Sequence, residues 1–357
     1  GSAGWPHCGW SRASQSGAAG ARNVCETGRV TTAVLPFAPQ PGGFEWLEGE
    51  PEFDPARHLQ LEMPERVRTL DEFGYTTEEI ARTATPVAVT SAFRVLSDEG
   101  AAVLLTVARR LEVFARANPR IERSVRSGCH RSKWFRDLCT SPDVTEHFGA
   151  IYGIDIAPHP ITSQLGHLNY APSELGSAVD KWHHDTLALD YVMMVADPAL
   201  LDGGDFEYFV GTKAEVAALA ERGERPSADR CVSVEWPGLG CAVAIHGNMV
   251  VHRGGPLSVA AERITMVNGY ISTDVTRDDQ TRHQDLFHVD DPRTLSAEWT
   301  RYAAWRAQHR LGRLIEDLPL DLDPSDAADR LSSAVADVTH TVKGLTEGLS
   351  RIHHYEL

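Results

Sequence analysis

The stretch Lys181-Trp182-His183-His184-Asp185-Thr186 places a histidine and an aspartate two residues apart, beside apolar runs. Alternate side chains of a β-strand project from the same face, so a strand over residues 181–196 would point His183 and Asp185 together and His184 away. An imidazole and a carboxylate on one face are two of the three ligands in the 2-His-1-carboxylate site that holds non-haem Fe(II). The stretch therefore predicts a metal site that needs one more ligand.

The composition is that of an acidic globular protein. The chain has 357 residues, and 50 acidic against 34 basic residues give a net charge of -16. This charge argues against nucleic acid or an anionic membrane as a partner, and no apolar run reaches the ~20 residues of a membrane span. The six cysteines form no CxxC pair, so a Cys-type zinc site is not expected and a cytoplasmic location is the expectation.

Four regions follow from the composition and periodicity. Residues 1–43, rich in Gly, Ala, Ser and Pro, predict a weakly ordered N-terminal arm. Residues 44–154 predict a helical region, with Ser97 capping a helix to about residue 117 and Ser141 capping one to about residue 152. Residues 155–275 predict a β core, and residues 276–357 a C-terminal helical region. The fold class is thus a mainly β core with flanking helices (α+β).

The β core is read from short apolar runs between Gly, Pro and Asn signals, at barrel or sandwich spacing. Strands are predicted over residues 161–170, 181–197, 205–210, 231–236, 241–246, 249–253 and 263–272. Helices are predicted over residues 213–222, 296–318 and 324–349.

Two histidines could complete the metal site, His246 and His252, and the turn signal Gly247-Asn248 puts them on different segments. If residues 249–252 and 263–270 pair as a hairpin, His252 and Arg263 face the same interior. A metal-chelating 2-oxo acid needs that arrangement, because its distal carboxylate requires a guanidinium. Two alternatives stay open: Arg253 could be the guanidinium that binds this carboxylate, or Arg263 could form an ordinary ion pair on its strand.

Taken together, these motifs resemble the Fe(II)/2-oxoglutarate-dependent oxygenase superfamily, and within it the phytanoyl-CoA dioxygenase-like group. His183-x-Asp185, then His252, then Arg263 occur in that order, and Trp182-His183-His184-Asp185 resembles the group's W-H-x-D segment. The segments at residues 203–212 and 246–256 resemble its turn–strand and paired-histidine segments, although Asp205 stands where an apolar residue is common. The resemblance covers roughly residues 155–275.

This resemblance implies a double-stranded β-helix of the jelly-roll or cupin-like kind. It implies that His183, Asp185 and His252 are the metal and catalytic residues, with Arg263 binding the distal carboxylate of 2-oxoglutarate. The cofactors would be Fe(2+), 2-oxoglutarate and O2, and the products would include succinate and CO2. Related halogenases carry a small residue in place of the carboxylate, so Asp185 favours hydroxylation, desaturation or ring formation.

The remaining candidates are assigned by their place on the expected strands and loops. Asn169 and Gln164 are expected to contact the co-substrate, and Trp182, Arg253, Tyr170 and Arg131 to lie on the substrate side. The alternative is ordinary packing for Asn169, Gln164, Tyr170 and Trp182, and a structural charge for Arg253. The basic stretch 120–140 reads as a solvated loop or as a wall for an anionic small-molecule substrate. The flanking helices could cover the barrel mouth or form a homodimer.

Two other functions stay open at this point. One is a β-barrel binding protein without turnover, and the other is a cupin-like metalloenzyme that does not use 2-oxoglutarate. The identity of the substrate does not follow from the sequence.

Overall fold

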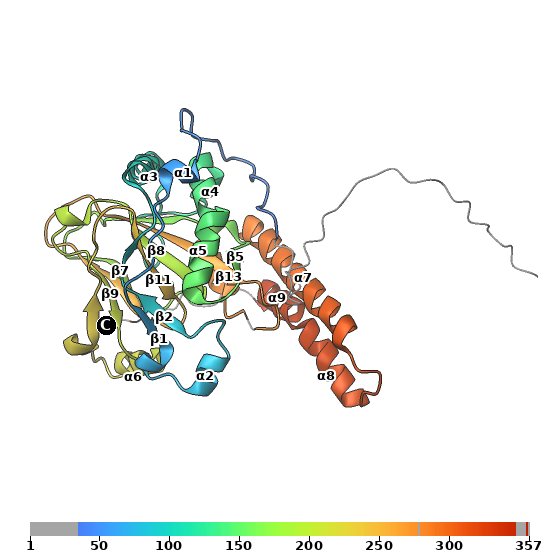
Figure 1. Cartoon of the computed structure of the whole chain (residues 1–357). Helices are drawn as coiled ribbons and strands as arrows, with labels where there is room; N and C mark the ends of the chain where they lie inside the picture. The colour runs from blue at the N-terminus through green and yellow to red at the C-terminus, as the bar shows by residue number, and fades with distance from the viewer. Residues whose placement is uncertain (1–34, 278, 348–354, 356–357) are drawn as a thin grey trace, which may run out of the picture. The chain divides into compact units, whose positions relative to one another are not determined.

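The core consists of two antiparallel sheets with helices around them (Figure 1), in a computed structural model that describes residues 35–277, 279–347 and 355. The larger sheet has the order β1 (Val67–Thr69), β2 (Val87–Thr90), β11 (Cys241–His246), β8 (Leu189–Met194), β13 (Ile264–Ser272), β6 (His167–Tyr170) and β4 (Ser124–Val125); β3 (Phe93–Arg94) pairs with β11 and β5 (Ile156–Pro158) with β13. The smaller sheet has the order β10 (Cys231–Ser233), β9 (Phe206–Phe209), β12 (His252–Pro256) and β7 (Ala178–His183). The predicted mainly β core with flanking helices is confirmed.

The two sheets face each other across an apolar layer. Val192 of β8 and Val243 of β11 share this layer with Phe206 and Tyr208 of β9. Tyr191, next to Val192, instead belongs to the cluster on the other side of the larger sheet. Because strand side chains alternate, β8 is buried on both faces, and each large apolar side chain contributes about 1.5–3 kcal/mol. The inner layer is where the site residues converge.

Helices cover the outer face of the larger sheet (Figure 1). Phe135 of α4 (Lys133–Cys139) and Phe148 of α5 (Pro142–Tyr152) pack there, beside α3 (Asp98–Leu111). The predicted caps are confirmed, since Ser97 Oγ accepts from the Gly100 N–H at 3.0 Å and Ser141 Oγ from the Val144 N–H at 3.4 Å. The helix after Ser97 ends at residue 111 rather than 117, because a short 3-10 turn follows it. The other elements of this half are α1 (Pro55–His58) and α2 (Thr77–Ala81), and α6 (Lys213–Glu221) follows β9.

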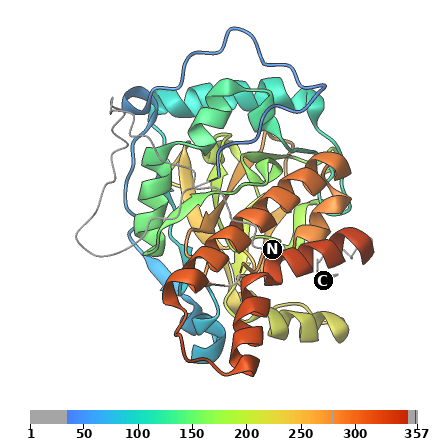
Figure 2. The ribbon, with the colours of Figure 1, turned by 90° about the vertical axis from the view of Figure 1, so that its right-hand side faces the viewer.

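The C-terminal helices lie together in Figure 2: α7 (Pro292–Asp317), α8 (Pro324–Ala334) and α9 (Ala336–Glu347). Tyr302 and Trp305 of α7 pack against Ala157 of β5 and Ile271 of β13. The single helix predicted over residues 324–349 is wrong, since it is broken between α8 and α9, and residues 348–349 lie outside the described residues. Within the described ranges no helix is both long and apolar enough to cross a membrane.

The N-terminal arm predicted over residues 1–43 lies mostly outside the described residues, which begin at residue 35. Its described end contacts the body, where the Phe37 ring lies 5.0 Å from the His130 ring and Gln40 Nε2 donates to the His130 carbonyl at 2.7 Å.

The strand predicted over residues 181–197 is wrong as one element. β7 ends at His183 in the smaller sheet, and β8 begins at Leu189 in the larger sheet. The chain therefore crosses from one sheet to the other over residues 184–188. A continuous apolar run cannot show this, because strands of either sheet are equally apolar where both faces are covered.

The hairpin predicted between residues 249–252 and 263–270 is also wrong. β12 pairs with β7 and β9, whereas β13 pairs with β8, β6 and β5. His252 and Arg263 nevertheless line the same hollow, because the two sheets face each other. The predicted strands 161–170, 231–236 and 249–253 are shorter or shifted, with a 3-10 turn over residues 162–164 in the first.

Glu298 connects α7 to the core through hydrogen bonds to Thr162, and the contribution of this contact to stability can be tested. Glu298 is buried, and its carboxylate accepts from the Thr162 N–H at 3.0 Å and from Thr162 Oγ1 at 2.5 Å; burial raises its pKa to about 7. When folding raises the pKa of an acid, the protein loses stability as pH rises from the pKa of that acid in the unfolded chain towards its pKa in the folded chain. The wild type should therefore lose stability between pH 5 and pH 8, whereas Glu298→Gln should not. We expect the free energy of unfolding of Glu298→Gln, relative to the wild type, to increase by about 2–3 kcal/mol over this range. Urea unfolding at both pH values measures this, and an unchanged difference would contradict it.

Candidate metal centre

Asp185 lies on the crossing between the sheets rather than on a strand. Its backbone N–H donates to the Gly247 carbonyl at 2.8 Å, which fixes the crossing against the turn after β11. A Cβ at Gly247 would lie 2.9 Å from Asp185 Cβ and 2.2 Å from Asp190 Oδ2, so only glycine fits there. The prediction that His183 and Asp185 share a strand face is therefore wrong, yet the crossing brings their side chains together.

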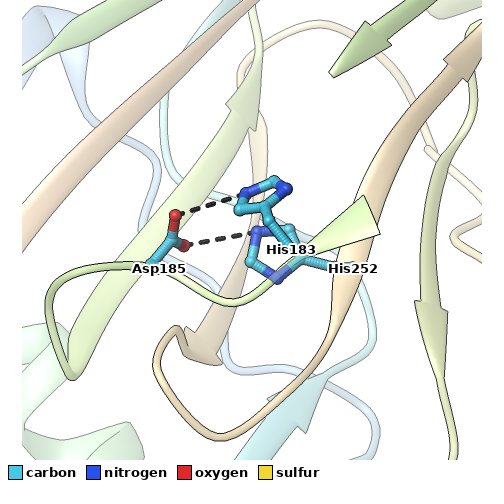
Figure 3. Close-up of side chains that lie close together, drawn as sticks. All are labelled: His183, Asp185 and His252. Carbon is cyan, nitrogen blue, oxygen red and sulfur yellow. Dashed lines mark ion pairs between the residues drawn. The ribbon is translucent and has the colours of Figure 1, made fainter. Parts of the chain in front are cut away.

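His183, Asp185 and His252 form a buried cluster in which the side chains point at one another (Figure 3). Asp185 Oδ1 lies 3.4 Å from His183 Nε2, and Asp185 Oδ2 lies 3.3 Å from His252 Nε2. One ligand atom from each residue lies within 4.8 Å of the others, and the part of the chain that the structure describes contains no second such group. Two imidazoles and a carboxylate form the donor set of the 2-His-1-carboxylate site.

Backbone hydrogen bonds fix the tautomers of both histidines. His183 Nδ1 lies 2.6 Å from the Lys181 carbonyl, and His252 Nδ1 lies 2.9 Å from the Val250 carbonyl. A carbonyl only accepts, so each Nδ1 carries a hydrogen, and Nε2 is the ring nitrogen that can bind a metal when the imidazole is neutral. The two Nε2 atoms and the two oxygens of Asp185 converge on one buried point. This donor set fits a divalent metal ion.

Burial and neighbouring charges shift the pKa values of the three residues in the cluster. Burial, followed by repulsion from Arg120, lowers the pKa of His183. Burial opposes ionisation of Asp185, but the two histidines outweigh it and hold its pKa well below the usual range. Burial alone would lower the pKa of His252, whereas Asp185 raises it above its ordinary value. Asp185 is therefore a carboxylate anion at neutral pH.

A β-bulge brings Asp180 beside the cluster. Along β12 and β7, His252 pairs with His183 and Gly254 pairs with Asp180, so three steps on β7 face two on β12. The extra residue reverses the alternation, and both Asp180 and His183 turn inward. Asp180 Oδ1 lies 2.8 Å from Arg120 Nε, and Arg120 Nη2 lies 3.9 Å from Asp185 Oδ1. Strict alternation predicts Asp180 on the outside, which is why sequence reasoning missed this pair.

Arg263 immediately precedes β13 and is 2% exposed. Its Nε donates to the Gly204 carbonyl at 2.5 Å, and no carboxylate among the described residues forms an ion pair with it. Burial lowers its pKa to about 10, which leaves it charged at neutral pH. A buried guanidinium without an anion is costly, so this side chain fits an anionic ligand.

The cluster and Arg263 line one small hollow of about 30 Å³ between the sheets. Asn169 and Thr265 lie in its wall, and His167 lies there with its Nε2 2.9 Å from Asn169 Oδ1. Val192 and Phe206 supply apolar wall on the two sheets. The hollow thus has nitrogen and carboxylate donors together with a guanidinium.

The other predicted residues are not members of the His–Asp–His cluster. Gln164 is on a 3-10 turn and lines a neighbouring hollow, and Arg131 lines an outer one. Tyr170 points to the outer face, where its hydroxyl donates to the Ala108 carbonyl at 2.7 Å. Arg253 lines the metal hollow, but its Nε donates to Glu207 Oε2 at 2.5 Å and its guanidinium stacks 4.8 Å from the Trp182 ring.

The two other candidate histidines, His184 and His246, are not part of the cluster. His184 Nδ1 lies 3.0 Å from the Tyr355 hydroxyl, as expected for a side chain that points away from His183. His246 is fully buried on β11, and burial lowers its pKa to about 3.

Asp190 is a second buried acid near the cluster that sequence reasoning missed. Neither carboxylate oxygen has a hydrogen-bond partner among the described residues. Burial, and then the charge of Asp185, raise its pKa well above the usual range. Asp185 is therefore the ionised carboxylate of the cluster, whereas burial favours the uncharged form of its neighbour Asp190. In the sequence Asp190 stands between Leu189 and Tyr191, and this apolar context gave no sign that it lies beside the cluster.

No family model matches the chain, and no curated protein matches it. Solved structures similar to it are of the Fe/2-oxoglutarate-dependent oxygenase type. They include the non-haem alpha-ketoglutarate-dependent epimerase SnoN from nogalamycin biosynthesis (16% identity, 52% of this chain and 78% of that chain, TM-score 0.38). HygX from Streptomyces hygroscopicus with nickel and 2-oxoglutarate bound is 14% identical (56% and 88% covered, TM-score 0.40), and EctD from S. alaskensis with bound Fe is 16% identical (69% and 89%, TM-score 0.40). These similarities are too distant to assign a reaction, which rests on the site itself.

Proposed function

We propose that this chain is a non-haem Fe(II)/2-oxoglutarate-dependent oxygenase that oxidises a C–H bond of a small organic substrate, with release of succinate and CO2. One observation carries the proposal. Two Nε2 atoms and the Asp185 carboxylate converge on a buried point, in the same hollow as a buried guanidinium that lacks a carboxylate partner.

The fold proposed with this function is the double-stranded β-helix, resembling the phytanoyl-CoA dioxygenase-like group. Its two sheets would be the larger one with β8, β11 and β13 and the smaller one with β7, β9 and β12. The ligands then come from both an end of β7 and an end of β12, with Asp185 on the crossing between the sheets. A metal held by these three residues would lie between the two sheets.

The residues have distinct tasks in this proposal. His183, Asp185 and His252 hold iron(II), which supplies the redox chemistry that couples decarboxylation of 2-oxoglutarate by O2 to oxidation of the substrate. The Lys181 and Val250 carbonyls keep the two imidazoles in the tautomer that binds metal. Arg263 pairs with the distal carboxylate of 2-oxoglutarate, with Thr265 and Asn169 beside it. Val192 and Phe206 restrict water on the remaining walls.

Anaerobic titration tests the cofactor assignment directly. We expect the purified protein to bind one Fe(II) and, on addition of 2-oxoglutarate, to develop a weak visible charge-transfer absorption, because both oxygens of the 2-oxo acid group chelate the metal. In air, the same sample should form succinate from 2-oxoglutarate. Iron binding without the absorption would favour a metalloenzyme that does not use 2-oxoglutarate, and failure to bind iron would favour a β-barrel binding protein.

A further inference from the structure

A large hollow opens outside the metal centre, with a volume of about 800 Å³. Binding sites of this size hold molecules as large as typical drugs. A third hollow of about 50 Å³ adjoins both: it shares Asn118, Ser124 and Arg126 with the outer hollow, and His167 and Asp185 with the metal hollow. The three hollows follow one another from the outer wall to the cluster.

The acids that line the outer hollow are engaged by the protein. Asp290 accepts from Arg126 at 2.5 and 2.9 Å and from Ser163 Oγ at 2.6 Å. Asp291 caps α7 by accepting from the Thr294 N–H at 2.9 Å. The Glu298 carboxylate is hydrogen-bonded to Thr162, and its pKa is raised to about 7. These acids therefore leave little negative charge unpaired in the wall.

Arginines in the same wall are not compensated in this way. Arg116, Arg131 and Arg293 form no ion pair with any carboxylate that the structure describes. The Arg131 guanidinium lies between two aromatic rings, 4.5 Å from the centroid of Phe44 and 3.8 Å from that of Phe114. Burial and then repulsion from Arg116 lower the pKa of Arg131, while Glu45 attracts it without forming an ion pair. Two guanidiniums that repel each other at the wall of a cavity favour an anion between them.

We propose that the outer hollow is the substrate-binding chamber and that Arg116 and Arg131 bind an anionic group of the substrate, a phosphoryl or carboxylate group. The substrate then lies with this group at the outer wall and extends past Asn118 and Arg126 towards Asp185. Phe44 and Phe114 hold Arg131 in place and offer apolar surface to the body of the molecule. The substrate role rests on the proposed oxygenase function, whereas the anion site does not.

Calorimetric titration of the iron-free, 2-oxoglutarate-free protein tests the anion site, with inorganic pyrophosphate and citrate as probes for phosphoryl and carboxylate groups. We expect at least one probe to bind, and the double variant Arg116→Gln/Arg131→Gln to weaken it at least tenfold, since each lost charge-assisted contact costs roughly tenfold. Arg116→Lys/Arg131→Lys should keep most of the affinity. Arg313→Gln removes an arginine that pairs with Asp274 elsewhere and should change nothing.

The two probes separate the sources of the anion, because the tighter one identifies the phosphoryl or the carboxylate arm. Failure of both probes to bind the wild type would overturn the proposal. Equal binding to the double glutamine variant would overturn it as well, because the probe would then occupy another site such as Arg263. Neither result would affect the anaerobic iron and 2-oxoglutarate titration, so failure of the anion site and failure of the oxygenase function are told apart.

Discussion

The Asp185→Ala protein is expected to lose iron binding by at least about a hundredfold and to form no detectable succinate. Asp185 supplies the only carboxylate of the His–Asp–His cluster, and its two oxygens lie 3.4 and 3.3 Å from the two Nε2 atoms. Loss of a group that merely supports a metal ligand already costs 10- to 100-fold in affinity, so loss of a ligand costs more. Iron content after anaerobic dialysis and succinate release measure the two effects.

The control for this variant is the neighbouring His184→Ala, which removes a contact to Tyr355 but no ligand atom. Asp185→Asn adds a second control, since it keeps the shape of the side chain and removes the charge. If all three proteins unfold at similar urea concentrations while only the Asp185 variants lose iron, the loss belongs to the metal centre. Turnover retained in Asp185→Ala would refute the assignment of the three ligands.

The sequence was sufficient to find the three residues of the cluster but not the geometry that unites them. His183 and Asp185 were expected on one strand, whereas the chain leaves β7 at His183 and crosses to the other sheet. The prediction that His183 and Asp185 lie together still held, because a side chain just beyond the end of a strand can reach the same point as one on the strand. Local pattern shows which side chains are polar within an apolar run, but not which sheet each half of the run joins.

The residues that were missed share a physical cause. Asp180 enters the site through a β-bulge, and a bulge in this strand has no residue signature that distinguishes it from regular alternation. Arg120 reaches the centre from an irregular segment between α3 and β4, where periodicity gives no direction. Tyr170 was expected at the site because its strand lines the interior, but its position within the alternation turns it to the outer face. Register, rather than residue type, limited the prediction.

In the proposed oxygenase, removal of the Arg263 guanidinium is expected to weaken 2-oxoglutarate binding at least about a hundredfold. The side chain is 2% exposed, and its Nε donates a hydrogen bond to the Gly204 carbonyl. Charge-assisted contacts contribute about 1.5–3 kcal/mol each, so loss of a two-pronged contact to a carboxylate accounts for this factor. The dissociation constant of 2-oxoglutarate, from the anaerobic charge-transfer titration of Arg263→Gln, measures it without requiring a substrate.

Arg253→Gln is the matched comparison, because Arg253 lies ten residues earlier on the facing sheet and pairs with Glu207 instead. If the dissociation constant of 2-oxoglutarate rises about a hundredfold in Arg263→Gln and less than about threefold in Arg253→Gln, Arg263 is the residue that binds its distal carboxylate. The opposite pattern would move it to Arg253, and no effect in either would leave Arg120 as the remaining guanidinium at the hollow. Iron binding should survive in Arg263→Gln, since no metal ligand changes. Arg263 lines the same hollow as the three residues of the cluster. If Arg263→Gln loses 2-oxoglutarate affinity but keeps iron affinity, the two groups are bound by different residues of this hollow.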